Sequence, residues 1–429
     1  MNTFANKRVT ILGLGRFGGN IAAARWLAEQ GAKVLVSDQD DAASLADSVK
    51  QLEGLPIEFR LGKLEQRMSD FVDTDLVVTS PAVKPSNAFL SAARDAGVTV
   101  TTEICLFVER CRGKVFGITG TKGKSTTTAM LGLILKHAMG DKRCFVGGNI
   151  GKSLLFDLPD ITDDSCVVLE LSSYMLHYLG DAGWSPDVAV VTMLGIDHID
   201  WHGSVDAYHA AKRNIVRNQK PGGLLVRRDD VLSSNFLTNP GVKLLTYPDP
   251  TRPTIDLILP GDHNRDNAQA AWLASGVDID IARQALGNFT GLPHRLQLVA
   301  ERDGVRFFND SNATIPESAV IACDAFSPGT VIQIVGGFRK PGISWDAMCA
   351  HLSARCKHVI CIGEFAADLC AMCDNAETAP TLDAAVARAK QIATPGDVIL
   401  LSPGTSSFGE FVNFQERGER FTTLAQQTP

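Results

Sequence analysis

Short apolar runs alternate with longer segments of helical periodicity along most of the chain. In the first hundred residues, Val9–Leu12, Lys33–Ser37 and Leu76–Thr79 are predicted as strands, and Asn20–Gln30 as one of the helices between them. Strands that alternate with helices are typical of a parallel sheet, because each parallel pair needs a crossover connection. This part of the chain therefore predicts an α/β domain.

The same alternation continues in two further parts of the chain. The predicted strands are Val115–Ile118, Cys166–Leu171 and Val188–Leu194 in the second part, and Val331–Val335, His358–Ile362 and Val398–Leu401 in the third. A long helix is predicted from Ser125 to about Ala138, and four prolines mark Thr246–Pro260 as a loop or a sheet edge. The length of 429 residues also favours three α/β domains, which we place at residues 1–102, 103–291 and 292–429.

Composition narrows the class of protein. Hydrophobic residues make up 45% and charged residues 21% of the chain, which is typical of a soluble globular protein. The net charge of −7 and the lack of a dense Lys/Arg run argue against a nucleic-acid partner. No apolar run approaches the roughly 18 residues of a membrane span, and Met1–Lys7 lacks the apolar core of a signal peptide, so we expect a cytoplasmic protein without membrane insertion.

The ten cysteines have no regular spacing, which favours reduced thiols over a disulfide framework. Cys370 and Cys373 have the two-residue gap of a zinc knuckle. No second pair with that gap follows, so ordinary thiols are the favoured interpretation.

The segment Gly120–Ser125 has the composition of a phosphate-binding loop. It follows a predicted strand and precedes a predicted helix, so its backbone N–H groups and the helix dipole would face a bound anion. Lys124 would reach the terminal phosphates of ATP and Ser125 would bind magnesium. Ile118 occupies the position of the first glycine in the strict spacing, so this is a variant loop. The alternative is a surface turn of small residues.

A second glycine-rich turn, Gly13–Gly18, follows the first predicted strand. It matches the dinucleotide-binding fingerprint, and Asp38 lies about 20 residues further on. The same glycines serve any pyrophosphate or uridine nucleotide at a helix N-terminus, and a purely structural turn is nearly as good an interpretation. Because an ATP loop follows in a separate part, we favour a nucleotide-linked substrate over NAD here.

Charged side chains at predicted strand ends supply candidate metal ligands. A carboxylate such as that of Glu170 is costly in an apolar strand unless it is paired or bound to a cation. Magnesium prefers oxygen ligands, so Glu170 and Ser125 are natural candidates, with His198 as an unusual addition for a second ion. A single histidine after a strand is more often a structural hydrogen-bonding residue.

Lys212, Arg295 and Asp310 each have an ordinary interpretation when taken alone. Lys212 lies on a predicted helix that begins near Val205, where a solvated lysine is the default. Arg295 alone is a surface cation, and Asp310 alone is a turn-forming acid. Only their order along the chain, together with the other motifs, gives them a functional meaning.

That order resembles the Mur ligase family, the ATP-dependent amino-acid-adding enzymes of peptidoglycan synthesis, over essentially the whole chain. The motifs that carry the resemblance are Thr119–Ser125, Gly147–Gly151, Glu170–Tyr174, Asp197-His198, Tyr208–Lys212, Gly261–Asn267, Pro293–Arg295, Asn309–Asp310, Gly336-Gly337 and Leu401–Pro403. The branch that adds D-glutamate to UDP-N-acetylmuramoyl-L-alanine is the most similar one.

The resemblance implies an N-terminal Rossmann-like domain for the UDP-linked substrate, a central ATPase domain with a mainly parallel sheet, and a C-terminal Rossmann-like domain that binds the amino acid. It implies that ATP phosphorylates the carboxylate of the UDP-linked substrate. The amine of the amino acid then attacks the acyl phosphate through a tetrahedral intermediate. Two magnesium ions are implied as cofactors and ATP as co-substrate, and we expect a monomer.

The resemblance also implies roles for individual residues. ATP would be bound by Gly120, Thr121, Lys122, Gly123, Lys124, Ser125, Thr126, Asn264, Asn267, Arg295 and Asp310. The catalytic set would be Lys124, Glu170, His198 and Lys212, with Ser125, Glu170, His198 and a carbamylated Lys212 around the metal ions. The UDP-linked substrate would contact Gly13, Leu14, Gly15, Arg16, Phe17, Asp38, Ser80, Asn149 and Ser172, and the amino acid would contact Thr314, Lys340, Ser407 and Phe414.

Three positions depart from the family pattern. Asn312 stands where many relatives have lysine, Ala82 stands where glycine is usual, and Pro341 follows the proposed glutamate-binding lysine. These departures weaken the choice of amino acid more than the reaction class. A sister ligase that adds L-glutamate, alanine or a diamino acid is therefore an alternative. Outside this class, an NAD-dependent oxidoreductase built on Gly13–Gly18 and a motor or transport ATPase are further alternatives.

Overall fold

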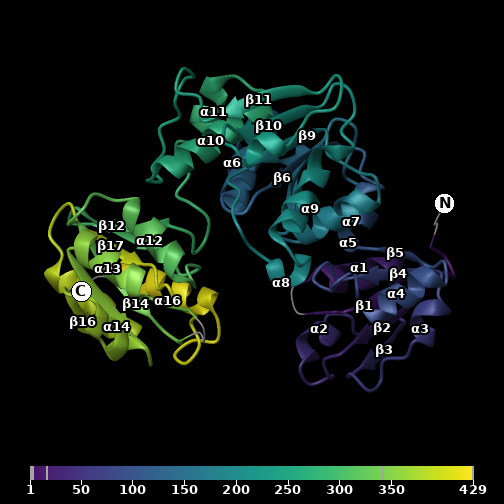
Figure 1. Cartoon of the computed structure of the whole chain (residues 1–429), viewed down its shortest axis with the longest axis horizontal. Helices are drawn as coiled ribbons and strands as arrows, with labels where there is room; N and C mark the ends of the chain where they lie inside the picture. The colour runs from purple at the N-terminus through teal and green to yellow at the C-terminus, as the bar shows by residue number, and fades with distance from the viewer. Residues whose placement is uncertain (1–3, 16–17, 340–342, 428–429) are drawn as a thin grey trace. The chain divides into compact units, whose positions relative to one another are not determined.

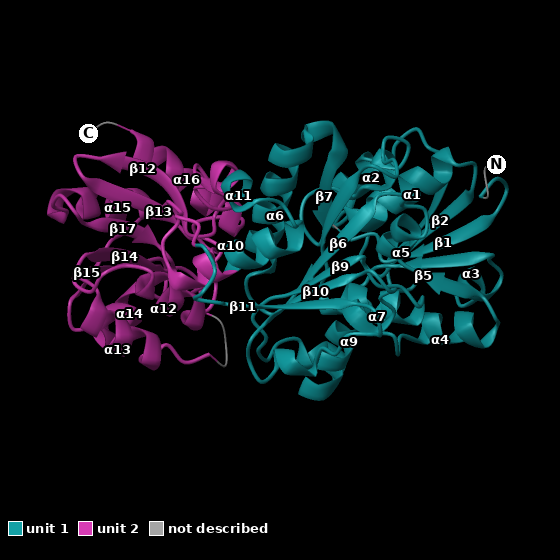
Figure 2. Cartoon of the chain, turned by 90° about the horizontal axis from the view of Figure 1, so that it is seen from above, with its two compact units in different colours: residues 1–253, 267–282 teal, residues 254–266, 283–429 magenta. Residues whose placement is uncertain are grey.

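The computed structural model describes residues 4–15, 18–339 and 343–427. Its strands form three sheets of five, six and six strands, with helices between most successive strands, so the predicted α/β fold is confirmed (Figure 1). The chain divides into two compact units, residues 1–253 with 267–282 and residues 254–266 with 283–429 (Figure 2). The domain boundaries at residues 102 and 291 stay a prediction.

The first sheet lies in the first unit, and all its strands are parallel in the order β3-β2-β1-β4-β5. Its strands are β1 Arg8–Leu12, β2 Lys33–Asp38, β3 Ile57–Leu61, β4 Leu76–Thr79 and β5 Thr99–Thr101, and its helices are α1 Gly19–Glu29, α2 Ala46–Lys50, α3 Ser69–Val72 and α4 Ala88–Asp95. The chain fills the β1-β2-β3 side first and then returns to the other side of β1 with β4. The carboxyl ends of β1 and β4 therefore border the crevice where open α/β sheets bind ligands.

The second sheet, also in the first unit, is parallel throughout in the order β11-β10-β9-β6-β8-β7. Its strands are β6 Lys114–Thr119, β7 Cys144–Gly148, β8 Cys166–Glu170, β9 Val188–Val191, β10 Leu224–Arg228 and β11 Lys243–Tyr247. The helices are α5 Glu103–Val108, α6 Lys124–Met139, α7 Ser173–Asp181, α8 Ile199–His202 and α9 Val205–Arg217, with short 3-10 turns at Asp141–Arg143, Leu155–Asp157 and Ser233–Asn235. Helices α10 Asp262–Ser275 and α11 Ile279–Leu286 each contain one boundary between the two units, and the third boundary follows Pro253.

The third sheet forms the second unit in the order β12-β13-β17-β14-β15-β16. Its strands are β12 Gln297–Arg302, β13 Val305–Asn309, β14 Val331–Gly336, β15 His358–Ile362, β16 Ala376–Thr378 and β17 Val398–Leu401. Its helices are α12 Pro316–Asp324, α13 Asp346–Arg355, α14 Ala366–Met372, α15 Leu382–Ile392 and α16 Phe414–Gln426. Only the β12-β13 pair is antiparallel.

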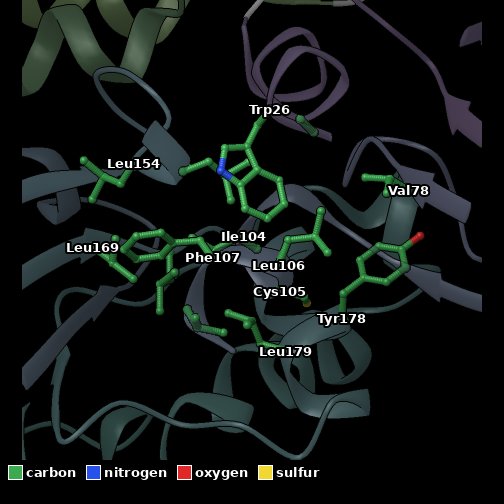
Figure 3. Close-up of a cluster of buried hydrophobic side chains, with 14 of the residues drawn as sticks. Trp26, Val78, Ile104, Cys105, Leu106, Phe107, Leu154, Leu169, Tyr178 and Leu179 are labelled. Carbon is green, nitrogen blue, oxygen red and sulfur yellow. The ribbon is translucent and has the colours of Figure 1, made fainter. Parts of the chain in front are cut away.

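One hydrophobic core joins the first and second sheets. Helix α5 is buried along its whole length, and Ile104–Phe107 share a cluster with Trp26 of α1, Leu169 of β8 and Leu179 of α7 (Figure 3). This packing fixes α7 and β8, which carry site residues, against the first sheet.

All ten cysteines are free thiols, and no three His, Cys, Asp or Glu side chains gather as a metal site within the described ranges. Among those residues, no helix has both the length and the apolar character needed to cross a bilayer.

Candidate active site

The phosphate loop leaves β6 at its carboxyl end and enters α6. The backbone N–H groups of Thr121 and Lys122 donate to the carbonyl of Met193, at 2.7 and 3.2 Å, so the end of β9 supports the loop. Gly123 precedes the helix and offers no side-chain cap. The N–H groups of the first turn, at Ser125 and Thr126, are therefore the donors that an anion at this helix end would use.

Two glycines of the loop are required by their surroundings. Gly120 has a φ of 151°, and a Cβ atom there would lie 1.9 Å from the Thr192 hydroxyl oxygen. Gly123 has a φ of 88°, and its Cβ atom would lie 2.7 Å from Asn267 Oδ1. The Thr192 hydroxyl bonds to the carbonyls of Thr119 (3.0 Å) and Lys122 (2.7 Å). A side chain at Gly120 would therefore displace the Thr192 hydroxyl, and one at Gly123 would displace the side chain of Asn267.

Glu170 and Asn149 meet at the neighbouring ends of β8 and β7. Gly148 pairs with Glu170 in the parallel register, and the Asn149 side chain donates to Glu170 Oε1 at 2.9 Å. The Glu170 side chain is buried, and its second oxygen, Oε2, has no hydrogen-bond partner. A buried carboxylate oxygen without a partner is costly, and a cation would satisfy it.

Lys212 projects from α9 under the phosphate loop. It is 1% exposed, its Nζ donates to the carbonyl of Gly120 at 2.8 Å, and it lies 4.7 Å from the centre of the Tyr208 ring. Burial and the positive charge of Lys124 lower the pKa of Lys212 to about 6, although Asp197 and Glu170 act in the opposite direction. This lysine is therefore mostly a neutral amine at neutral pH.

Tyr208 is a site residue to which the sequence analysis gave no role. Its hydroxyl lies 3.0 Å from Thr121 Oγ1, which also accepts the N–H of Gly195 at 2.9 Å. Burial raises the pKa of Tyr208 to about 12, so the phenol stays protonated. The tyrosine thus fixes the middle of the phosphate loop and covers Lys212. Its four-residue spacing from Lys212 on one helix was the available signal.

His198 lies directly before α8 with a φ of 51°, a conformation that few non-glycine residues adopt. Its side chain is 44% exposed, and Nε2 lies 3.4 Å from an oxygen of Asp197. Within the described residues, His198 and Glu170 do not belong to any cluster of three His, Cys, Asp or Glu side chains. Magnesium held by one carboxylate, a hydroxyl and phosphate oxygens does not require such a cluster.

The two asparagines assigned to ATP fall in different units. Asn267 is buried in the first unit, where its Oδ1 accepts the Thr127 hydroxyl at 3.3 Å beside Gly123. Asn264 belongs to the second unit and donates to the carbonyl of Pro260 at 2.6 Å. Asn267 therefore lies beside the phosphate loop, and the role of Asn264 stays a prediction.

The glycine turn after β1 is held by Asp38 at the end of β2. One oxygen of Asp38 accepts the N–H of Gly15 at 3.1 Å, and the other accepts the N–H of Asp40 at 3.0 Å. Gly13 and Gly15 both have positive φ, and Leu14 is buried. The Asp38 carboxylate thus shapes the turn itself.

Ser80 follows β4 and donates its backbone N–H to Leu12 at 3.0 Å, which places it beside the Gly13 turn. The hydroxyl of Ser172 caps α7 by accepting the N–H of Met175 at 3.2 Å. Arg16 and Phe17, which the sequence analysis also assigned to the UDP-linked substrate, lie outside the described residues, as does Lys340 of the amino-acid set.

In the second unit, Arg295 and Asp310 lie on two segments that contact each other. Asp310 accepts the N–H of Leu296 at 3.0 Å and the hydroxyl of Ser402 at 2.7 Å. Arg295 itself is exposed, and its N–H bonds to Leu292 at 3.0 Å. The carboxylate of Asp310 therefore ties the turn around Arg295 to the end of β17.

Arg417 is bonded to the segments that carry residues assigned to the amino acid, and the sequence analysis gave it no role. This arginine of α16 is 1% exposed and donates to Oγ (3.0 Å) and to the carbonyl (2.9 Å) of Ser311. Ser311 Oγ in turn donates to the carbonyl of Phe414 at 2.8 Å. Burial lowers the pKa of Arg417 to about 10, and its Nη1 has no hydrogen-bond partner.

Arg417 and Ser407 line one cavity of about 330 Å³ at the carboxyl ends of β14 and β15. Gly337 and Gly363 border it as well. Thr314 lies on the loop whose Ala313 carbonyl accepts the N–H of Gly404 at 2.9 Å. The loops that carry Ser407 and Thr314 are therefore bonded to each other, and the start of α16 at Phe414 is bonded to Ser311.

These features define a class: an α/β protein whose central sheet carries a phosphate loop, with a buried lysine and a partly unpaired buried carboxylate near the loop. Three family profiles match the chain. They describe a Mur ligase MurD-like N-terminal domain over residues 7–102, a Mur ligase middle domain over residues 118–253, and a Mur ligase glutamate ligase domain over residues 294–404.

Curated relatives match over nearly the full length. The UDP-N-acetylmuramoylalanine–D-glutamate ligase of Roseiflexus sp. (strain RS-1) is 38% identical and covers 98% of this chain and 99% of its own. The enzyme of the same name from Acetivibrio thermocellus is 33% identical, with coverages of 98% and 96%. The chain therefore belongs to the Mur ligase family.

Solved structures show the same fold at low identity. The MurF ligase of Thermotoga maritima in complex with ADP has a TM-score of 0.57 at 16% identity and covers 99% of this chain and 96% of its own. The FolC protein of E. coli in complex with ADP has a TM-score of 0.53 at 18% identity, with coverages of 75% and 91%.

Proposed function

We propose that the protein is an ATP-dependent ligase that joins D-glutamate to UDP-N-acetylmuramoyl-L-alanine in the synthesis of peptidoglycan precursors. The observation that carries the proposal is the full-length similarity to enzymes named for this reaction, at 38% and 33% identity. The phosphate loop with buried Lys212 and Glu170 beneath and beside it supplies chemistry suited to phosphoryl transfer.

The reaction divides into two steps. The carboxylate of the UDP-linked substrate attacks the γ-phosphorus of ATP, forming a C–O–P bond and releasing ADP. The neutral amine of glutamate then attacks the acyl carbon, and the tetrahedral intermediate loses phosphate and a proton to give the amide. A free carboxylate is a poor acyl donor, and the acyl phosphate, which is a mixed anhydride, is a good one. The charge that gathers on the phosphates needs cations around it.

At the ATP end, Lys124 would hold the terminal phosphates, and Asn267 would lie on the adenine side. Ser125 and Glu170 fit a magnesium ion, because Glu170 Oε2 is buried and has no hydrogen-bond partner. When bound, the ion would offset phosphate charge. We propose His198 for a second ion. Asn264, Arg295 and Asp310 of the second unit complete the proposed nucleotide set.

Carbamylation of Lys212 is supported by its protonation state. A carbamate forms when a neutral amine adds to carbon dioxide, and burial with the charge of Lys124 lowers the pKa of Lys212 to about 6. The product is an anion, which the charge of Lys124 and bound magnesium would stabilise. We therefore propose that Lys212 acts as a carbamate beside the cations.

The remaining substrate roles stay as predicted from the sequence. We assign the UDP-linked substrate to the Gly13–Phe17 turn with Asp38, Ser80, Asn149 and Ser172. We assign glutamate to Thr314, Lys340, Ser407 and Phe414, with Arg417 as an added cation. The cytoplasmic location, the monomeric state and the absence of a nucleic-acid partner also remain predictions. The ligase relatives give no support to the oxidoreductase or the motor ATPase.

An amino-acid panel tests the substrate assignment. With ATP, magnesium and UDP-N-acetylmuramoyl-L-alanine present, we expect ADP release to depend on D-glutamate and to stay at background with L-glutamate, alanine or a diamino acid. Dependence on another amino acid would identify a sister ligase. ADP release without any amino acid would instead indicate a simple ATPase.

Arg417→Lys is expected to raise the KM for D-glutamate by about tenfold while leaving the KM for ATP unchanged. The variant keeps a positive charge but loses the planar fork that bonds to Ser311 at two points. Steady-state ADP release with each substrate varied in turn measures both constants. Arg420→Lys, an exposed arginine of the same helix, is the matched control. An unchanged KM for D-glutamate would contradict the assignment.

A further inference from the structure

The short turn from Ser80 to Val83 borders the glycine turn of the first sheet. It is closed by a bond from the N–H of Val83 to the carbonyl of Ser80, at 3.0 Å. A Cβ atom on Gly13 would lie 3.5 Å from Val83 and 3.6 Å from Ser80, so the two turns are in contact. The position of this turn therefore sets the wall of the crevice at the ends of β1 and β4.

Trp201 of α8 bonds to this turn from the second sheet's side of the unit. Its indole N–H donates to the carbonyl of Ala82 at 3.0 Å. Its ring is held in place by the rings of Tyr174, 4.8 Å away, and His177, 5.4 Å away. Helix α8 begins directly after His198, so Trp201 is only three residues from a proposed metal ligand.

Tyr178 of α7 bonds to the next carbonyl of the same turn. Its hydroxyl donates to the carbonyl of Val83 at 3.2 Å. The ring is buried in the core shared by the two sheets, and its hydroxyl lies at the edge of that cluster (Figure 3). Burial raises the pKa of Tyr178 to about 12, so the hydroxyl is a permanent donor. Helix α7 starts three residues after Glu170.

Two consecutive carbonyls of one turn thus accept hydrogen bonds from two helices whose first turns adjoin Glu170 and His198. Both donors sit on rings that are packed in place, so neither can follow the turn if it moves. No bond of this kind is needed to close the turn, because the Val83 to Ser80 bond already does so.

We propose that Trp201 and Tyr178 are positioning residues that hold the Ser80–Val83 turn in the register required to bind the UDP-linked substrate. The proposal rests on the proposed function for the identity of that substrate. It predicts that the two donors contribute to the binding of the UDP-linked substrate and leave ATP binding and the chemical step unchanged.

Trp201→Phe and Tyr178→Phe test this with little loss of ring packing. Each is expected to raise the KM for UDP-N-acetylmuramoyl-L-alanine by about three- to tenfold, the effect of one lost hydrogen bond, with kcat and the KM for ATP within about twofold of wild type. Trp272→Phe is the matched control, because it removes an indole bond of the same length, 3.0 Å, to the carbonyl of Val277. An unchanged KM for the UDP-linked substrate in both variants would overturn the proposal. A loss of kcat that is the same whether ATP or the UDP-linked substrate is varied would overturn it as well.

Hydrogen exchange separates this result from the proposed function. Without any substrate, Trp201→Phe is expected to speed exchange of the Val83 amide by about threefold or more, and Trp272→Phe is expected to leave it unchanged. Exchange at the wild-type rate in Trp201→Phe would contradict the positioning role, whatever the substrate is. Calorimetric titration of wild-type protein with UDP-N-acetylmuramoyl-L-alanine tests the substrate itself, and no binding there would contradict the proposed function alone.

Discussion

Lys212→Met is expected to lower kcat for ligation by about a hundred- to a thousandfold and, at the same time, to make the protein more resistant to unfolding. The loss of activity follows from removing the amine under Gly120 that we propose becomes a carbamate anion beside the phosphates. The gain in stability follows from burial, because Lys212 is 1% exposed and its pKa is lowered to about 6.

The sign of the pH dependence follows from the two states of the lysine. In the unfolded chain its pKa is about 10.4, so between pH 6 and pH 10 the unfolded state binds a proton that the folded state does not. The stability of the wild type therefore rises with pH across this window. Below pH 6 the lysine is charged in both states, so the folded protein bears the full cost of a buried charge. Methionine removes the penalty and loses a hydrogen bond to Gly120 worth about 1 kcal/mol.

Urea denaturation in bicarbonate-free buffer measures this difference. The variant is expected to exceed the wild type by several kcal/mol in free energy of unfolding at pH 6, with the excess vanishing near pH 10. Lys220→Met, at an exposed lysine just after the same helix, is the matched control and is expected to change neither stability nor activity. A variant that is less stable than wild type at pH 6 would show that burial does not lower the pKa of Lys212.

The strands that the pattern predicted are those buried on both faces. Strand β4 has the predicted bounds, and β14 extends the prediction by one residue, because continuous apolar runs leave no choice of face. Strand β9 ends at Val191 and not at Leu194. The reason is chemical, because Thr192 and Met193 leave the sheet to bond to the phosphate loop. The pattern of apolar residues along the chain does not predict hydrogen bonds between a strand end and a distant loop.

The site was predictable where several residues form one motif and was missed where a single residue acts. Lys124 comes after β6 and Glu170 is the last residue of β8, and these two strands are neighbours in the sheet, as the motifs require. Arg417 lies on α16 among exposed charged residues, so its burial depends on Ser311, which is more than a hundred residues away in the chain. The proposed role of Trp201 likewise depends on its hydrogen bond to the carbonyl of Ala82, which is also distant in the sequence. No local pattern encodes these distant partners.

Lys212 and Glu170 share one physical feature. Each is a buried ionisable side chain whose charge or hydrogen bonding the surrounding protein does not fully stabilise. The lysine gives up its charge, and the glutamate keeps an oxygen without a partner. Proteins bear such unfavourable groups where function requires them. Both residues should therefore show the same trade between stability and activity.

Glu170→Gln is expected to lower kcat by about a hundredfold or more and to move the magnesium dependence to higher concentration. Glutamine keeps the size of the side chain, and its oxygen can still accept from Asn149 as Oε1 does at 2.9 Å. What it loses is the negative charge and the second oxygen, Oε2, which is buried without a partner and fits the cation. Without ligands the variant is expected to be as stable as wild type or more so.

ADP release across a magnesium titration, with urea denaturation of the apo protein, checks both halves of this expectation. Glu103→Gln is the matched control, since Glu103 is also a buried glutamate of the first unit, bonded to Ser153, and burial raises its pKa. The control is expected to keep the wild-type magnesium dependence. If Glu170→Gln kept it as well, the unpaired oxygen would not be a metal ligand. If the variant instead unfolded more easily, the carboxylate would be part of the scaffold and not of the chemistry.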